Sequence, residues 1–295
     1  MSSILKYRWF FLSIAVAAFI IMLSSISYQV SDNDSLDFSI KSISALLADP
    51  DFLIYLTVGF IAQMIDGSLG MAYGVSSTSF LMSAGVSPAI ASSSVHVAEV
   101  FTTAVSGISH WKFGNVDKTL FKKLAIPGAL GAALGAYFLS SFDGNVIKPY
   151  IALYLLIMGI IIIRKAFKKV ILFKENKRLG ALALFGGFVD ATGGGGWGPV
   201  VTSTLMGSGN NPKLTIGTVN AVEFFVALAA SGIFTIFVGI NSWPVIIGLI
   251  IGGIIAAPIG AYITHKINPK IAMVIVGVVI ILLSFRTILK ALMLT

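Results

Sequence analysis

Four carboxylates lie within apolar stretches of the chain, and they are the residues best placed to do chemistry. Asp66 and Asp190 each begin a glycine-rich segment, and Glu99 and Glu223 lie in the apolar stretches that follow. An ionised group at membrane depth costs about 2.5–3.5 kcal/mol or more unless it is paired or solvated, so these side chains should face the interior of a helix bundle. There the glutamates could bind and release protons and couple them to substrate movement. Alternatively, they could stay protonated and only hold the glycine-rich segments in place.

The two glycine-rich segments interrupt apolar stretches at corresponding places in the two halves of the chain. The first runs from Asp66 to Gly74 (DGSLGMAYG) and the second from Asp190 to Gly198 (DATGGGGWG). The apolar run before each is shorter than the roughly 20 residues that a helix needs to cross a bilayer, which predicts two broken re-entrant hairpins. Polar backbone at this depth must be satisfied by protein or line a water-filled cavity. Paired segments of this kind are typical of a transporter's binding site.

A small anion is the ligand that such segments suit best. Glycine lets backbone N–H groups approach a ligand closely, and the helix after each break would direct its positive end at an anion. His96 shares a helical face with Glu99, and Asn220 takes the equivalent place beside Glu223. Close helix packing is the alternative explanation of the glycines. The expected coupling or hinge residues are the four carboxylates, and the expected substrate-binding residues are Gly67, Ser68, Gly70, Gly74, His96, Thr192, Gly194, Gly195, Gly196, Trp197, Gly198 and Asn220.

Composition places the chain among integral membrane proteins. Hydrophobic residues make up 57% and charged residues 11% of its 295 residues, and the mean hydropathy is +0.96. Soluble domains are roughly half apolar and a quarter charged. The net charge of +8 lies mostly in short stretches between apolar runs, which indicates membrane topology rather than nucleic-acid binding. The absence of cysteine excludes disulfides and thiolate metal sites, and we expect neither a cofactor nor a bound metal.

The second half of the chain repeats the order of features in the first. One constant offset relates three pairs of residues: Asp66 and Asp190, Pro88 and Pro212, and Glu99 and Glu223. The predicted fold is an all-α polytopic membrane protein of two inverted repeats, residues 51–170 and 171–295, each with a broken hairpin and three transmembrane helices. Residues 1–50 add an N-terminal transmembrane helix (9–28) and an outside loop. The six full spans expected in the repeats are 89–109, 125–142, 149–163, 214–238, 244–263 and 271–289.

The placement of basic residues predicts the orientation. With a cytoplasmic N-terminus, most of the 20 Lys and Arg residues fall in cytoplasmic segments, as the positive-inside rule requires. An odd number of crossings per repeat then makes the two repeats inverted, which is an architecture of secondary transporters. The exceptions, predicted on the outer side, are Lys41, Lys148, Arg286 and Lys290.

A family resemblance agrees with these expectations. The paired glycine-rich acidic segments, the helices with Glu99 and Glu223, and the Gly-Ala-Tyr motifs at Gly135 and Gly260 resemble the TauE/SafE sulfite exporter family. The resemblance covers about residues 52–290. It implies a multi-pass carrier of the cytoplasmic (inner) membrane for sulfite, an organosulfonate or a related small sulfur anion. The motifs leave open which anion is moved, in which direction, and whether the protein forms a homo-oligomer.

We therefore expect a secondary transporter rather than an enzyme, one that moves a sulfur-containing anion across the lipid bilayer by alternating access with a coupling proton. Two alternatives remain. A divalent-cation transporter would use the four intramembrane carboxylates as oxygen ligands. A membrane-embedded metalloenzyme would use His96 and Glu99 as a metal or acid–base pair, but the sequence indicates no third ligand, and Asn220 replaces the histidine in the second repeat.

Overall fold

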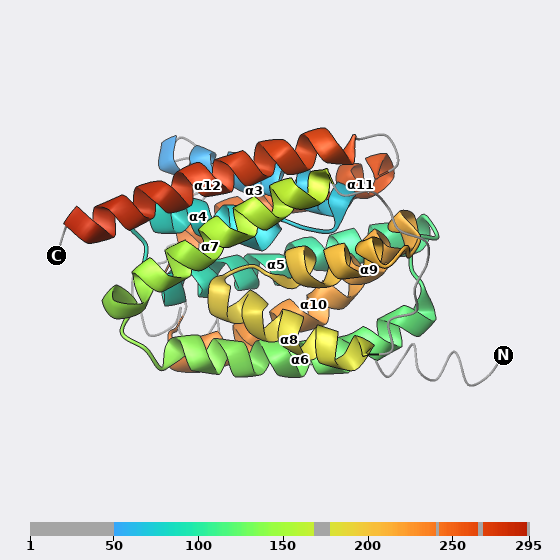
Figure 1. Cartoon of the computed structure of the whole chain (residues 1–295), viewed down its shortest axis with the longest axis horizontal. Helices are drawn as coiled ribbons and strands as arrows, with labels where there is room; N and C mark the ends of the chain where they lie inside the picture. The colour runs from blue at the N-terminus through green and yellow to red at the C-terminus, as the bar shows by residue number, and fades with distance from the viewer. Residues whose placement is uncertain (1–49, 168–177, 240–241, 265–267, 294–295) are drawn as a thin grey trace, which may run out of the picture. The chain divides into compact units, whose positions relative to one another are not determined.

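The computed structural model describes residues 50–167, 178–239, 242–264 and 268–293. They belong to one unit, Pro50–Thr295, in which every regular element described is a helix (Figure 1). The predicted N-terminal helix, nearly all of the predicted outside loop and most of the basic stretch between the predicted repeats lie outside the described residues.

Apart from residues 167–178, the connections between consecutive helices have five residues or fewer. Proline stands at the first position of four of the helices, α3, α5, α10 and α12, where its missing N–H is not needed and its fixed φ favours the helix. The elements are α3 (Pro50–Leu69), α4 (Tyr73–Ala84), α5 (Pro88–Lys112), α6 (Lys118–Ser140), α7 (Gly144–Ala166), α8 (Leu179–Gly193), the π-helix η1 (Gly198–Thr202), α9 (Ser203–Gly207), α10 (Pro212–Phe237), α11 (Trp243–Ile263) and α12 (Pro269–Met293).

Six helices of the described part are long and apolar enough to cross a membrane, namely α3, α6, α7, α10, α11 and α12. Five of them coincide with predicted spans. The prediction that the first hairpin begins with a helix too short to cross is wrong, because the helix continues through Asp66 and Gly67 to Leu69 and reaches 20 residues. The second hairpin does begin with a short helix, α8, of 15 residues.

Helix α5, which we predicted as a span, is not among the six although it has 25 residues. Its length suffices for the roughly 30 Å of a bilayer core. Its composition is the reason, since one face carries serine, threonine, histidine and glutamate side chains. That face is buried against α4, α10 and α11, so the polar residues contact protein rather than lipid.

Helices from the two halves of the chain pack in matching pairs. Helix α3 packs against α11 and α8 against α6, while α5 packs against α10 and α7 against α12. Glycine permits the first two contacts: a Cβ at Gly252 would lie 2.7 Å from the nitrogen of Phe60, and a Cβ at Gly131 would lie 3.0 Å from that of Phe188. Small residues at helix interfaces allow such close backbone approach within membranes.

Large apolar side chains cover the outer faces of the spans. Ile126, Leu130 and Leu134 are exposed at four-residue intervals along α6, and Ile271 and Ile275 are exposed in the same way on α12. An exposed apolar surface of this extent indicates contact with lipid. The chain is therefore a multi-pass helical membrane protein whose polar side chains are gathered inside.

Candidate functional site

Each hairpin is broken by a short segment with left-handed backbone. The value of φ is 67° at Gly70 and 98° at Ala72 in the first break, and 68° at Gly194 and 143° at Gly195 in the second. Glycine adopts such values freely, whereas alanine does so at a cost. The first break joins α3 to α4 and the second joins α8 to η1, each a few residues after its aspartate.

The two breaks cross in direct backbone contact. A Cβ at Gly74 would lie 2.8 Å from Cα of Gly195, and a Cβ at Gly195 would lie 2.8 Å from Cα of Val75. Likewise, a Cβ at Gly198 would lie 2.5 Å from Cβ of Met71. Side chains at these positions would push the hairpins apart. In this conformation the glycines thus serve close packing, which was the alternative explanation drawn from the sequence.

Two reciprocal hydrogen bonds fasten the crossing. Thr202 Oγ1 donates to the carbonyl oxygen of Gly70 at 2.6 Å, and Thr78 Oγ1 donates to that of Gly194. The offset that relates Asp66 to Asp190 also relates Thr78 to Thr202 and Gly70 to Gly194. Each hairpin therefore uses the same threonine to hold the same glycine of the other.

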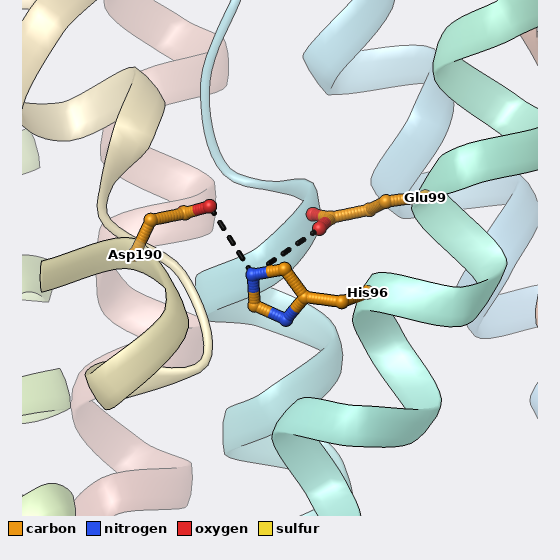
Figure 2. A group of neighbouring side chains, drawn as sticks. All are labelled: His96, Glu99 and Asp190. Atoms are coloured by element: carbon orange, nitrogen blue, oxygen red, sulfur yellow. Dashed lines mark hydrogen bonds and ion pairs between the residues drawn. The ribbon is translucent and has the colours of Figure 1, made fainter. Parts of the chain in front are cut away.

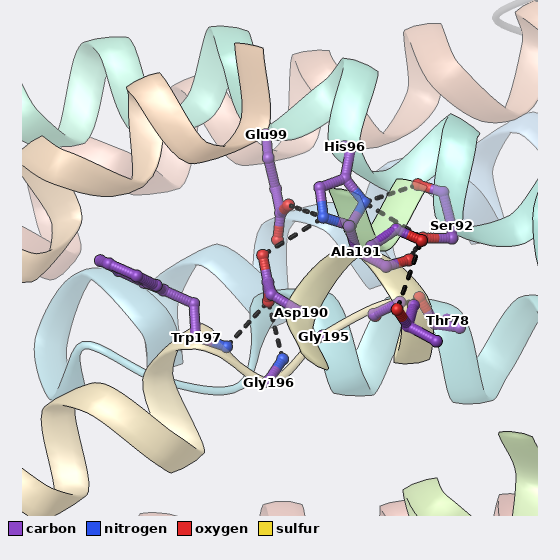
Figure 3. A network of polar contacts seen from close by, with 12 residues as sticks. Thr78, Ser92, His96, Glu99, Asp190, Ala191, Gly195, Gly196 and Trp197 are labelled. Atoms are coloured by element: carbon purple, nitrogen blue, oxygen red, sulfur yellow. Dashed lines mark hydrogen bonds and ion pairs between the residues drawn. The ribbon is translucent and has the colours of Figure 1, made fainter. Parts of the chain in front are cut away.

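Asp190 holds the second break from the interior of the bundle. Its Oδ1 accepts hydrogen bonds from the backbone N–H groups of Gly196 (2.7 Å) and Trp197 (2.8 Å), and its Oδ2 lies 3.2 Å from Nε2 of His96 (Figure 3). Hydrogen bonds from N–H groups to a carboxylate are among the stronger ones in proteins. The N–H groups that we expected to bind a substrate anion are thus bound by a carboxyl group of the protein.

His96 lies between two carboxylates (Figure 2). Its Nδ1 is 2.8 Å from the carbonyl oxygen of Ser92, which can only accept, so Nδ1 carries a hydrogen. Its Nε2 faces Asp190 at 3.2 Å and Glu99 Oε2 at 3.9 Å. A hydrogen bond between Nε2 and Asp190 needs one proton, carried by the imidazole or by the carboxyl group. The contact is therefore a proton-binding position.

The other three carboxylates are buried, and most of their oxygens have no hydrogen-bond partner. Asp66 and Glu99 are each 1% exposed and Glu223 is 4% exposed. Both oxygens of Asp66, both of Glu99 and Oε2 of Glu223 are unpartnered, and the charges of all four carboxylates interact with one another. The ion-pair contacts of this group within the described structure come from His96. Four buried carboxylates beside one imidazole cannot all be ionised, so the group must hold protons.

Three predicted substrate contacts are engaged in hydrogen bonds within the protein. Ser68 Oγ donates to the carbonyl oxygen of Ile65 at 3.0 Å, and Thr192 Oγ1 donates to that of Gly135 at 3.3 Å. Asn220 accepts from a serine of α5 at 2.8 Å and donates within its own helix at 3.2 Å. A ligand could reach these groups only by replacing such bonds.

Two further predicted contacts, Gly67 and Trp197, also face protein. The carbonyl oxygen of Gly67 lies 2.9 Å from Nε2 of His110. The Trp197 side chain is fully buried, and its indole N–H donates to the carbonyl oxygen of Val219 at 3.3 Å. Its ring packs so closely that a Cβ at Gly128 would lie 2.7 Å from it. Trp197 therefore forms a wall between the second break, α6 and α10.

Sequence reasoning missed that Asp190 is the third group of a cluster with His96 and Glu99. One ligand atom from each of the three lies within 4.8 Å of the others, and all three residues are buried. This corrects the expectation that His96 and Glu99 have no third possible metal ligand nearby. The position of an aspartate at the start of a break was the available signal, but nothing in the sequence places it beside a helix 94 residues away.

Helix α7 supplies two contacts that the sequence did not single out. The Tyr154 hydroxyl donates to the carbonyl oxygen of Gly195 at 2.7 Å, and Lys165 Nζ donates to that of Pro199 at 2.6 Å. Both accepting carbonyls belong to the second hairpin, at the break and at the start of η1. Polar residues inside an otherwise apolar run were the signal that could have identified them.

An open pocket of about 210 Å³ lies at the start of α10. It lies beside the first break, because Thr264 donates to the carbonyl oxygen of Gly67 at 3.2 Å and Cα of Ile216 would lie 3.2 Å from a Cβ at Gly70. Its lining residues are Asn211, Pro212, Lys213, Ile216 and Thr264.

Comparison with known proteins matches most of the chain. A family model described as sulfite exporter TauE/SafE matches residues 55–287. The chain is 49% identical over 248 residues, 81% of its length and 83% of the relative's, to the probable membrane transporter protein YtnM of Bacillus subtilis strain 168. It is 23% identical over 266 residues, 80% of its length and 97% of the relative's, to the probable membrane transporter protein YunE of the same organism. No solved structure matches.

Proposed function

Because the chain belongs to the TauE/SafE sulfite exporter family, we propose that it is a secondary transporter that moves a small sulfur-containing anion, sulfite or an organosulfonate, across the cytoplasmic membrane. Alternating access with a coupling proton is the proposed mechanism, and we assign no enzymatic reaction to the chain. The observation that carries the proposal is the crossing of two glycine-rich breaks beside four buried carboxylates.

Two inverted repeats are the proposed architecture. Exchanging the halves of the chain turns the α3–α11 contact into the α8–α6 contact, and it maps the α5–α10 and α7–α12 contacts onto themselves. The reciprocal threonine bonds between the breaks follow the same exchange. Two equivalent halves that meet at a central site can rock against each other, which is how inverted-repeat transporters alternate access. A cytoplasmic N-terminus completes the proposed topology.

The substrate anion competes with Asp190 for the same donors in this proposal. Asp190 binds the N–H groups of Gly196 and Trp197 while the hairpins are crossed. A sulfite or sulfonate oxygen has the same acceptor chemistry as a carboxylate oxygen and would take these N–H groups when the aspartate leaves. The described conformation, in which Asp190 binds these N–H groups, is then a closed state of the site.

Proton coupling follows from the charge of the site. An anion that enters beside four carboxylates meets repulsion unless those groups carry protons. The proposed route for a proton is the contact of His96 with Asp190, together with Glu99 and Glu223. Protonation of Asp190 would weaken its hold on the N–H groups and admit the anion, so proton and anion would move in the same direction.

Transport by purified protein in proteoliposomes tests the proposal. We expect uptake of one member of a panel of sulfite, thiosulfate, taurine and sulfoacetate, accelerated by a pH gradient that is acidic on the substrate side. Glu99→Gln and Glu223→Gln should each abolish the response to the gradient. Lys122→Gln, an exposed change on α6, is the control and should leave both rate and response unchanged. Uptake that ignores the gradient in the wild type would contradict proton coupling.

A divalent-cation transporter is the second candidate, favoured by one observation. His96, Glu99 and Asp190 could supply three metal ligands within 4.8 Å of one another. A ligand that binds only the folded state raises its apparent stability by mass action. Stabilisation of the purified protein by Mn²⁺ or Zn²⁺, lost in His96→Ala and absent with every sulfur anion, would select this candidate over the anion transporter.

A further inference from the structure

Three cationic side chains converge on the C-terminal end of α4. Lys148 Nζ donates to the carbonyl oxygen of Gly85 at 3.1 Å, Lys290 Nζ to that of Ser83 at 3.3 Å, and Arg286 Nη1 to the Ser83 hydroxyl at 3.3 Å. Lys148 lies in the first two turns of α7, and Arg286 and Lys290 lie near the C-terminal end of α12. Figure 1 shows both helix ends at the same end of the bundle as the end of α4.

These three residues, here called the α4 cation cluster, are not neutralised by acidic groups of the described chain. No ion pair joins any of them to a described carboxylate. Lys148 and Lys290 are close enough for their charges to interact. The nearby Asp143 uses its Oδ1 to cap the start of α7, through the N–H groups of Asn145 and Val146. The cluster therefore keeps a net positive charge.

The cluster also keeps hydrogen-bond donors for a ligand. An ammonium has three N–H donors and a guanidinium has five. The described structure uses one donor of each side chain, and all three side chains are exposed or half-buried. Capping of the α4 carbonyls explains the bonds that are made, because cations favour helix C-termini. It does not explain why three cations gather where one would serve.

The predicted membrane topology places the α4 cation cluster on the outer side. Lys148, Arg286 and Lys290 are three of the four basic residues that the charge pattern placed on the outer side, against the positive-inside tendency. In this predicted topology, three of the four outer basic residues lie at one point. Helix α4 runs from this point to Tyr73, at the first break, over 12 residues, which is about 18 Å of helix.

We propose that the α4 cation cluster is an outer docking site for the transported oxyanion. A guanidinium and two ammonium groups suit a sulfite or sulfonate group, which offers several acceptor oxygens at once. Clustered charge raises the local concentration of an oppositely charged ligand and its rate of arrival. The inference rests on the proposed function, and it names where the anion is held on the outer face before or after it passes the breaks.

The test is the concentration of labelled sulfite, or of whichever panel anion the wild type moves, that gives half-maximal uptake into neutral-lipid proteoliposomes. For the triple variant Lys148→Gln, Arg286→Gln, Lys290→Gln we expect this concentration to rise about 3-fold to 10-fold from the cluster side only, with the maximal rate kept. The wild-type value should rise with ionic strength, and the variant should respond less. Lys122→Gln is the matched control at the other end of the bundle.

Several outcomes would overturn the docking site. An unchanged half-maximal concentration in the triple variant would do so. If, in addition, the maximal rate and the melting temperature fell, the cluster would be a helix cap rather than a docking site. Loss of bound phosphatidylglycerol together with an effect confined to anionic bilayers would assign the cluster to lipid. If the wild type moves no sulfur anion, the proposed function fails separately. The cluster is then tested by stabilisation with inorganic sulfate in neutral detergent, which the triple variant must lose.

Discussion

The two hairpin breaks occupy equivalent places in the chain, yet their aspartates do different things. Both oxygens of Asp190 have partners, in two backbone N–H groups and His96. Asp66 interacts with the N–H of Tyr73, which corresponds to that of Trp197, but neither of its oxygens makes a hydrogen bond of ordinary length and angle. The helix after the first break is a regular α-helix of 12 residues, whereas the second continues as a π-helix of five. The aspartate thus fastens the second break and not the first, although threonine bonds hold both hairpins at the crossing.

This difference shows how two similar halves can play unequal parts. The fastened break sets the geometry of the site, and the π-helix that follows it is a form often found at functional positions. The unfastened break leaves an uncommitted carboxylate, Asp66, next to the crossing. We expect the first break to change conformation more easily during transport. Four predictions, taken from the largest expected effect to the smallest, test this comparison.

Gly195→Ala should have the largest effect. The new Cβ would lie 2.8 Å from Cα of Val75, and φ at this position is 143°, which disfavours alanine. Overpacking and backbone strain together should cost about 3 kcal/mol or more, enough to prevent stable folding. Yield and melting temperature of the purified variant measure it. Gly232→Ala is the matched control, since nothing lies within 4 Å of its Cβ, and it should fold normally.

Asp190→Asn should destabilise the protein much more than Asp66→Asn. Asp190→Asn removes the carboxylate charge from two backbone hydrogen bonds and from the contact with His96. This should lower the free energy of unfolding by about 1.5–3 kcal/mol. Asp66→Asn removes a buried carboxylate without hydrogen bonds, so it should be neutral or stabilising. Melting temperatures in detergent at pH 7 compare the two. Equal losses in both variants would refute the distinction between a fastened and an unfastened break.

Thr202→Val and Thr78→Val should each destabilise the folded protein moderately and to a similar extent. Each removes one hydroxyl that binds a glycine carbonyl of the opposite hairpin, for about 1 kcal/mol. Ser77→Ala serves as control, because the buried Ser77 hydroxyl has no partner and its removal should not destabilise. Melting temperatures decide the matter. A loss in only one of the two valine variants would show that the crossing is held by a single bond.

Ala72→Gly should have the smallest effect and the opposite sign. Alanine at φ 98° is strained, and glycine would relieve about 1 kcal/mol of that strain. Part of this gain in stability is offset because glycine has more conformational freedom in the unfolded chain. We therefore expect a slight rise in melting temperature. A clear fall would mean that the first break is stiffer than its unpartnered aspartate suggests.

The sequence predicted the positions of the helices better than the contacts between them. Long apolar runs located five of the six membrane-crossing helices, because burial in lipid requires continuous apolar composition. The same rule failed at α3, where Asp66 and Gly67 resemble an interruption although the helix continues through them. It also overrated α5, whose polar face is compensated by neighbouring helices that composition does not reveal.

The site was only half predictable for a similar reason. The carboxylates and glycine clusters were visible because such residues are rare in apolar runs. Their contacts were not, since His96 meets Asp190 across 94 residues and Thr202 meets Gly70 across 132. The offset between the halves could have indicated reciprocal contacts, but only packing decides that the N–H groups of Gly196 and Trp197 are bound by Asp190.

The packing of α3 against α11 has a consequence for the order of synthesis. Thr264, just after α11, bonds to Gly67 of α3 and is made 197 residues later. At roughly 5–20 residues per second, about 10 to 40 s separate the two on the ribosome. During that time the face of α3 that meets α11, at Gly59 and Gly67, lacks this partner. We therefore expect the yield of folded protein to depend on how long the membrane-insertion machinery keeps α3 available until α11 emerges.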